Sequence, residues 1–164
     1  METFVQGDDP LTSEIEPIVP FKLGLLLINK GFGKARNLTI QSFQPQIVDN
    51  EKGLPVDFKI ISTTVNGDKY SLPSLLVNLG DVNSMETKES LWLFSASLKG
   101  TFTTLNATYT NINPNGDPKL SLIDKIEFKR LIRTVLVDVP IKKDNLLDFF
   151  VWEDLTLFPN KVNI

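Results

Sequence analysis

Short segments in which apolar and polar residues alternate recur along the chain at spacings near ten residues, separated by Gly, Pro and Asn turns. A period of two places apolar side chains on one face of a β-strand. At 164 residues the chain has the size of one domain, or of one domain with an appended segment. No strand–helix–strand alternation is visible, so the pattern predicts an all-β, antiparallel β-sandwich rather than a parallel sheet.

Some eight strands are expected. Seven segments carry the pattern most clearly: residues 21–28, 37–43, 56–65, 74–79, 90–98, 101–110 and 122–139. The Asn66-Gly67 pair is a strong hairpin signal, because both residues tolerate the positive φ of a two-residue turn. The segment 122–139 also fits a helical stripe, but its β-branched end, which includes Val135 and Val137, favours strand.

The residue types that the chain lacks exclude several kinds of chemistry. There is no His and no Cys, which excludes Ser-His-Asp and Cys-His nucleophilic systems, His or Cys zinc sites and thiol redox chemistry. The net charge of −3 argues against a general nucleic-acid binder, which needs a basic face. The sequence therefore predicts a protein that is not an enzyme and has no cofactor.

The ends of the chain suggest three parts: an extended acidic lead-in over 1–20, the sandwich over 21–139, and a C-terminal docking segment over 140–164. Five acids and no base precede Lys22, unlike a signal peptide. The strongest apolar run, 23–28, is far too short for a membrane span. The chain could still be part of a larger secreted protein.

Two stretches carry a resemblance to a known family. Residues 24–40 combine an apolar strand, the turn Asn29-Lys30-Gly31 and a second alternating strand, and residues 90–94 (Ser-Leu-Trp-Leu-Phe) are similar to a later central strand. Over roughly residues 17–139 the chain resembles the CARDB-type, cell-adhesion-related immunoglobulin-like domain. The resemblance implies an immunoglobulin-like β-sandwich that is one module of a secreted or surface-anchored protein.

A weak calcium candidate lies in the turn cluster after residue 110. Oxygen-bearing side chains alternate before a glycine, at Asn111, Asn113, Asn115 and Asp117. Calcium needs six to eight oxygen ligands with enough carboxylates to balance its charge, and only Asp117 is charged here. A hairpin turn is therefore the favoured interpretation. The Gly31-x-Gly33 pair is interpreted as a turn as well, because a phosphate-binding loop needs a helix after it.

Two N-glycosylation sequons begin at Asn37 and Asn106. Each Asn alternates with apolar neighbours, so both side chains are expected to face away from the core. Trp92, with apolar residues on both sides, is expected in the core. The apolar tail, with Phe149, Phe150 and Trp152, should dock on the sandwich, on a neighbouring domain or on another copy, which would give a homo-oligomer.

These features lead to one functional hypothesis and two alternatives. The hypothesis is a non-enzymatic structural or adhesive module, extracellular or at the cell surface, that contacts neighbouring domains or another protein. One alternative is a carbohydrate-binding sandwich that stacks a glycan on Phe43, Tyr70 and Tyr109. The other is an intracellular sandwich of the water-stress late-embryogenesis class.

Overall fold

The computed structural model describes residues 3–9, 11–49, 56–70, 72–112, 123–127, 129–137, 146–152 and 162–163. It contains strands and no helix in these ranges, and every strand ladder is antiparallel, so the predicted all-β antiparallel fold is confirmed. The strands are β1 (Thr3–Val5), β2 (Phe21–Ile28), β3 (Ala35–Asp49), β4 (Phe58–Val65), β5 (Asp68–Lys69), β6 (Val77–Val82), β7 (Thr87–Ala96), β8 (Gly100–Ile112), β9 (Arg130–Val135), β10 (Asp148–Trp152) and β11 (Val162–Asn163).

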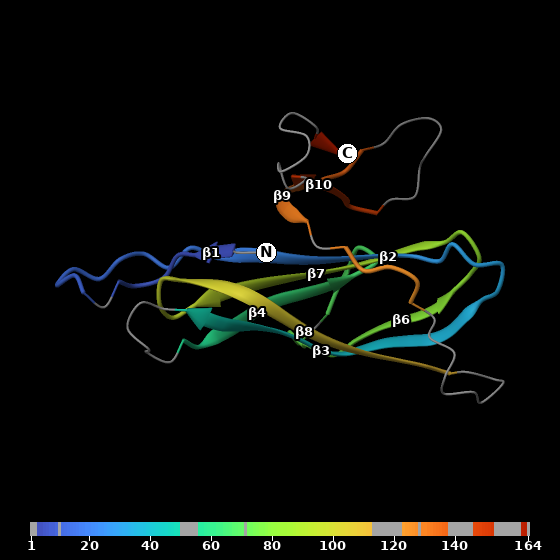
Figure 1. The fold of residues 1–164 in the computed structure, drawn as a ribbon, viewed down its shortest axis with the longest axis horizontal. Helices are drawn as coiled ribbons and strands as arrows, with labels where there is room; N and C mark the ends of the chain where they lie inside the picture. The colour runs from blue at the N-terminus through green and yellow to red at the C-terminus, as the bar shows by residue number, and fades with distance from the viewer. Residues whose placement is uncertain are drawn as a thin grey trace.

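Two four-stranded sheets make up the body of the molecule, in the orders β1-β8-β3-β6 and β2-β7-β4-β5 (Figure 1). From β2 to β8 the chain passes repeatedly from one sheet to the other, with only β4 and β5 adjacent in the same sheet. Loops that join the two sheets therefore gather at the ends of the strands.

One hydrophobic cluster lies between the two sheets. Leu38, Ile40, Val77, Leu79 and Val82 come from the first sheet and Val65, Trp92 and Phe94 from the second. Trp92 is fully buried, as predicted, and its indole Nε1 donates a hydrogen bond to the Ser74 carbonyl oxygen at 2.9 Å. A buried indole N–H needs such a partner, so this contact fixes the orientation of the largest core side chain.

The Asn66-Gly67 turn joins β4 to β5 as predicted. Both residues have positive φ, 51° and 84°, as expected for the type of turn that matches the twist of paired strands. Asn66 also ties the turn to β7: its backbone N–H donates to the Glu89 carbonyl at 3.0 Å, and its side-chain Oδ1 accepts from the Glu89 N–H at 3.1 Å.

The acidic N-terminal segment contributes a strand that the sequence did not indicate. β1 pairs with the start of β8, and Val5 is 1% exposed in a second small core cluster with Ala96. Asp8 then forms an isolated parallel bridge with Leu98. Residues 3–9 are therefore integrated into the body, whereas an extended lead-in was expected.

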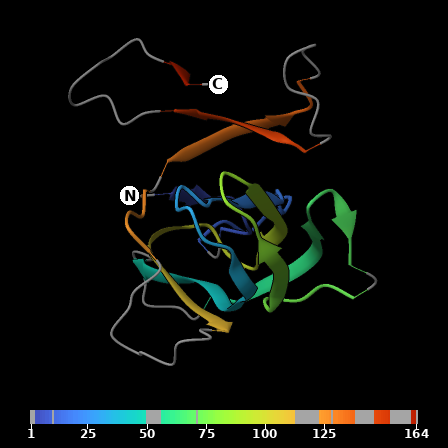
Figure 2. The ribbon, with the colours of Figure 1, turned by 90° about the vertical axis from the view of Figure 1, so that its right-hand side faces the viewer.

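The C-terminal part forms a third sheet in the order β11-β10-β9. Figure 2 shows it on one side of the two larger sheets, next to β2. Within the predicted strand over 122–139, the structure has a shorter strand, β9, which covers Arg130–Val135. It pairs with β10, so strands from either side of the expected boundary at residue 140 belong to one sheet.

Candidate partner-binding loops

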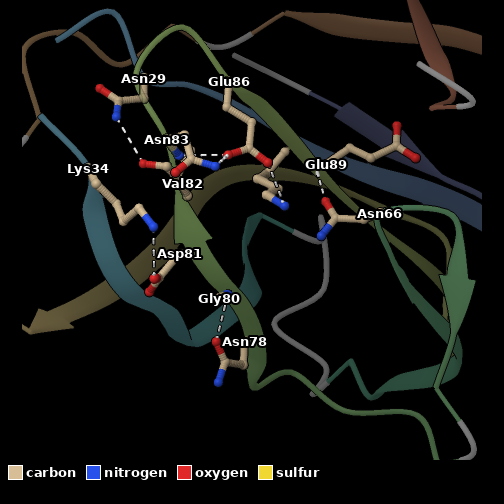
Figure 3. Close-up of polar contacts among 11 residues, drawn as sticks. Asn29, Lys34, Asn66, Asn78, Gly80, Asp81, Val82, Asn83, Glu86 and Glu89 are labelled. Carbon is tan, nitrogen blue, oxygen red and sulfur yellow. Dashed lines mark hydrogen bonds and ion pairs between the residues drawn. The ribbon is translucent and has the colours of Figure 1, made fainter. Parts of the chain in front are cut away.

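At one end of the molecule the β2–β3 loop (residues 29–34) lies beside the β6–β7 loop (residues 83–86), and we call these segments the end loops (Figure 3). In Figure 1 they form the right-hand end. Each loop connects a strand of one sheet to a strand of the other. The two loops consequently close the same end of the core.

The Asn29 side chain fixes the β2–β3 loop and joins it to the end of β6. Its side-chain Nδ2 donates to the Gly33 carbonyl at 2.8 Å and to the Val82 carbonyl at 3.0 Å, while its Oδ1 accepts from the Gly31 N–H at 3.0 Å. An Asn side chain bonded to the backbone two residues on is a recognised way to fix a turn. The Asn-x-Gly turn noted in the sequence thus has a structural reason in this protein.

Further hydrogen bonds run directly between the end loops. The Met85 N–H donates to the Asn29 carbonyl at 2.8 Å, and the Asn29 N–H donates to the Glu86 carbonyl at 3.0 Å. The Ser84 hydroxyl donates to the Gly31 carbonyl at 2.7 Å. The two loops are therefore one hydrogen-bonded unit.

A carboxylate closes the β6–β7 loop on itself. Glu86 Oε2 accepts from the backbone N–H and the side-chain amide of Asn83 at 2.6 and 2.8 Å, and Oε1 lies 2.8 Å from Lys88 Nζ. The hydrogen bond from Lys88, followed by that from the Asn83 backbone, holds the pKa of Glu86 below its ordinary value. Glu86 is thus ionised at neutral pH.

A second polar group lies where β3 begins. Asp81 Oδ1 accepts from the Asn37 N–H at 3.0 Å, and its Oδ2 lies 3.5 Å from Lys34 Nζ. The Asn37 backbone hydrogen bond is the main reason that the pKa of Asp81 is lowered, and Lys34 adds to it. Asn37 has φ 47° at a register shift of β3, and its Oδ1 accepts from Asn78 at 3.1 Å.

The end loops display two apolar side chains to solvent. Phe32 is fully exposed, and Met85 is 74% exposed. Met85 has φ 60°, an uncommon backbone conformation for a residue that is not glycine. Strained residues of this kind persist where the surroundings hold them, here through the hydrogen bond to Asn29.

Four basic residues lie in the end loops or within two residues of them in the sequence. Lys30 and Arg36 are exposed, and Lys34 is balanced by Asp81 as Lys88 is by Glu86. The end loops thus carry an exposed apolar pair, with exposed basic residues in or close to the same segments.

The structure describes the side chain of one of the two sequon asparagines. Asn37 is exposed, while its neighbours Leu38 and Ile40 are buried. Asn106 lies in β8, and its side chain is outside the described part of the chain. Glycosylation at either position stays a prediction.

The calcium candidates fall largely outside the described residues. Asn111 lies in β8 without a described side chain, and Asn113, Asn115 and Asp117 are in a range that the structure does not describe. In the ranges that it does describe, no three acidic side chains come close enough together to hold a metal ion. Those same ranges also contain no helix long and apolar enough to cross a membrane.

Two of the three aromatic residues considered for glycan stacking, both tyrosines, do not present an open ring. Tyr70 and Tyr109 are partly buried against the main core, and the Tyr70 hydroxyl accepts from the Asn78 N–H at 3.2 Å. The side chain of Phe43 is outside the described part. Stacking on a sugar needs an open ring face, which the placement of the two tyrosines does not favour.

The three predicted docking residues of the tail have different surroundings. Phe149 faces Gly24 of β2, and the Phe150 ring lies 5.2 Å from the guanidinium carbon of Arg133, within the hairpin itself. Trp152 is 40% exposed. The structure thus places one of the three residues, Phe149, against the body of the molecule.

Comparisons with known proteins give no relative: no family model, no curated protein and no solved structure matches the chain. The candidate site therefore stands on its geometry alone.

The sequence indicated the Asn29 turn but not the part of this turn in linking two loops, and it did not indicate Phe32 or Met85. A large aromatic between Gly31 and Gly33 was the available signal for Phe32, and no sequence signal marks Met85.

Proposed function

We propose that the chain is an immunoglobulin-like β-sandwich that works as a non-enzymatic structural or adhesive module of a larger extracellular or cell-surface protein. The proposal is supported by two antiparallel four-stranded sheets with a shared core and by the repeated passage of the chain between them. In sandwiches of this kind the loops cluster at the two ends and are available for contact.

The observation that carries the proposal is the pair Phe32 and Met85, held out to solvent on hydrogen-bonded end loops. Burying one such side chain is worth about 1.5–3 kcal/mol, so covering both would contribute substantially to binding. The loops are already held in place by Asn29 and Glu86, so little conformational entropy would be lost on binding. These two properties are those expected of a contact site.

In this function each residue has a distinct part. Phe32 and Met85 would enter an apolar pocket of the partner, while Lys30 and Arg36 would face its acidic rim. Asn29 and Glu86 would keep the two loops in one geometry. The module would thereby fix the position of a neighbouring domain or of a partner protein.

Adhesion of protein-coated beads to the surface of the producing cells tests this function. The double variant Phe32→Ser/Met85→Ser should reduce bead retention at least tenfold without changing the melting temperature, because both side chains are exposed. The matched control is Leu11→Ser/Ile15→Ser, which removes two exposed apolar side chains from the loop before β2. Its retention should equal that of the unchanged protein.

Two results would contradict the proposal. Equal retention of both variants and the unchanged protein would show that the end loops make no contact. Binding to a glycan array that persists in the Phe32→Ser/Met85→Ser variant would instead support the carbohydrate-binding alternative.

A further inference from the structure

The hairpin formed by β9 and β10 lies against the outer face of β2. Two adjacent side-chain contacts hold it there. Thr134 and Phe149 are directly paired in the hairpin, so their side chains share a face. Lys22 and Gly24, two residues apart on β2, share the face opposite the core. Lys22 Nζ donates to Thr134 Oγ1 at 3.1 Å, and Phe149 packs over Gly24.

Gly24 acts as a notch for Phe149. A Cβ atom at position 24 would lie 2.6 Å from Phe149 Cε2 and 3.0 Å from Cζ, and its three closest neighbours would all be atoms of this ring. Real Cβ atoms do not approach so closely. The absence of a side chain at position 24 is therefore what lets the ring reach the strand, and the fit is specific for this pair.

The hairpin keeps its own hydrogen bonds. In the described part of the chain its strands pair with each other and with β11, and not with either four-stranded sheet. Arg133 and Phe150, the next directly paired residues, lie on its other face and contact each other. If the hairpin left β2, it would lose its side-chain contacts with that strand but none of the backbone hydrogen bonds between its own strands.

The docked hairpin leaves apolar surface open on both partners. Leu26 and Ile28, which follow Gly24 on the same face of β2, are half exposed, as is Trp152 in β10. The 17 residues between Ile112 at the end of β8 and Arg130 at the start of β9 could span about 60 Å at most when extended. Exchange of an identical element between copies is a low-cost route to a dimer, and a linker of this length permits it.

We propose that the partner of this β2 face is a second copy of the chain, and that two copies dimerise by exchanging their β9–β10 hairpins. Phe149 of each copy then occupies the Gly24 notch of the other. The contact between the two copies is the same as the one seen within a single chain, because exchange replaces the hairpin of one copy by that of the other.

A pair of complementary variants tests the exchange. Gly24→Val fills the notch but keeps Phe149, and Phe149→Ala removes the ring but keeps the notch. The chain has no Cys, so a single Ser13→Cys substitution, at an exposed residue, carries a donor dye in one variant and an acceptor in the other. Size-exclusion chromatography with light scattering, together with energy transfer, reports the dimer.

The unchanged protein should form a concentration-dependent dimer, and each variant alone should need at least tenfold more protein to dimerise. Mixing the two variants should restore the dimer and give energy transfer, because in the mixed dimer Phe149 of one chain meets Gly24 of the other. The milder Gly24→Ala replaces Gly24→Val if circular dichroism shows that the latter is unfolded.

An unchanged protein that stays monomeric at millimolar concentration would overturn the proposal. So would variants that dimerise as readily as the unchanged protein, or a mixture without energy transfer. Each of these results concerns the hairpin, and none depends on the end loops, so failure here is separate from failure of the adhesive function.

Discussion

At the scale of single residues, the two tryptophans give the sharpest contrast in the chain. Trp92 is fully buried and hydrogen bonded to Ser74, whereas Trp152 is 40% exposed. Trp92→Ala should lower the free energy of unfolding by about 3–5 kcal/mol, through lost burial and a cavity. Trp152→Ala, the matched control, should cost less than about 1 kcal/mol. Urea unfolding followed by circular dichroism measures both, and equal losses would contradict the described core.

Gly7 offers a second residue-scale prediction. A Cβ atom there would lie 2.6 Å from the Leu98 carbonyl carbon and 2.8 Å from the Ala96 carbonyl oxygen, which are backbone atoms that cannot move aside easily. Gly7→Ala should therefore destabilise the protein by about 1–3 kcal/mol. Gly33→Ala, where a Cβ atom meets nothing within 4 Å, is the control and should be nearly neutral. A tolerated Gly7→Ala would mean that the N-terminal segment does not pack on residues 96–98.

Some features of single residues could be predicted from the sequence, and others could not. The burial of Trp92 could be predicted because its strand is apolar on both faces. The pairing of Gly24 with Phe149 could not, because it joins positions far apart in the sequence and depends on the shape of one ring. The exposure of Met85 depends on a backbone conformation that no local pattern of residues indicates.

At the scale of elements, the Asn29 side chain fixes the β2–β3 loop and joins it to the end of β6, where the β6–β7 loop begins. Asn29→Ala removes its side-chain bonds to the Gly33, Val82 and Gly31 backbone and leaves two carbonyls with one partner fewer. We expect a loss of about 1–3 kcal/mol in stability and faster amide exchange in both end loops. Lys30→Ala, at the exposed neighbouring residue, should change neither. Exchange that quickens in only the β2–β3 loop would contradict the coupling.

The Glu86 carboxylate makes the β6–β7 loop sensitive to acid. Its pKa is lowered in the folded protein, mainly by the hydrogen bond from Lys88, so its stabilising effect is present above its ordinary pKa of 4.5. This stabilisation begins to decrease when the pH falls below 4.5. It is lost once the pH has fallen below the lowered pKa of Glu86 in the folded protein. Amide exchange of the loop, compared at about pH 6 and pH 3 after correction for intrinsic rates, should show more frequent opening in acid. Glu86→Gln should show a smaller pH effect, and an identical one would contradict this role.

Elements differ in how well the sequence indicates them. The bounds of β2 and the β4–β5 hairpin follow from alternation and from Asn66-Gly67, both local signals. β1 was missed because three residues are too few to show a period, and it forms only through its pairing with β8. β9 ends at Val135, since the partner strand β10 determines how far the ladder extends.

At the scale of the whole molecule, the all-β antiparallel architecture could be predicted because it depends on period and turn spacing, which are spread over the entire chain. The arrangement of the third sheet could not, because docking on β2 depends on surface shape rather than on period. The proposed site likewise exists only because the fold brings residues 29–34 next to 83–86. Neither loop alone carries a motif that indicates binding.

The central claim, that the end loops contact a partner protein, is tested most directly by photo-crosslinking. Phe32 is replaced by the photoreactive p-benzoylphenylalanine, and in a control protein the same residue replaces Ile15, which is also exposed. After irradiation with surface proteins of the producing cells, position 32 should give one discrete protein adduct that disappears when Met85→Ser is added. Position 15 should give none. Adducts at position 15 alone, or an adduct at position 32 that is indifferent to Met85→Ser, would contradict the account.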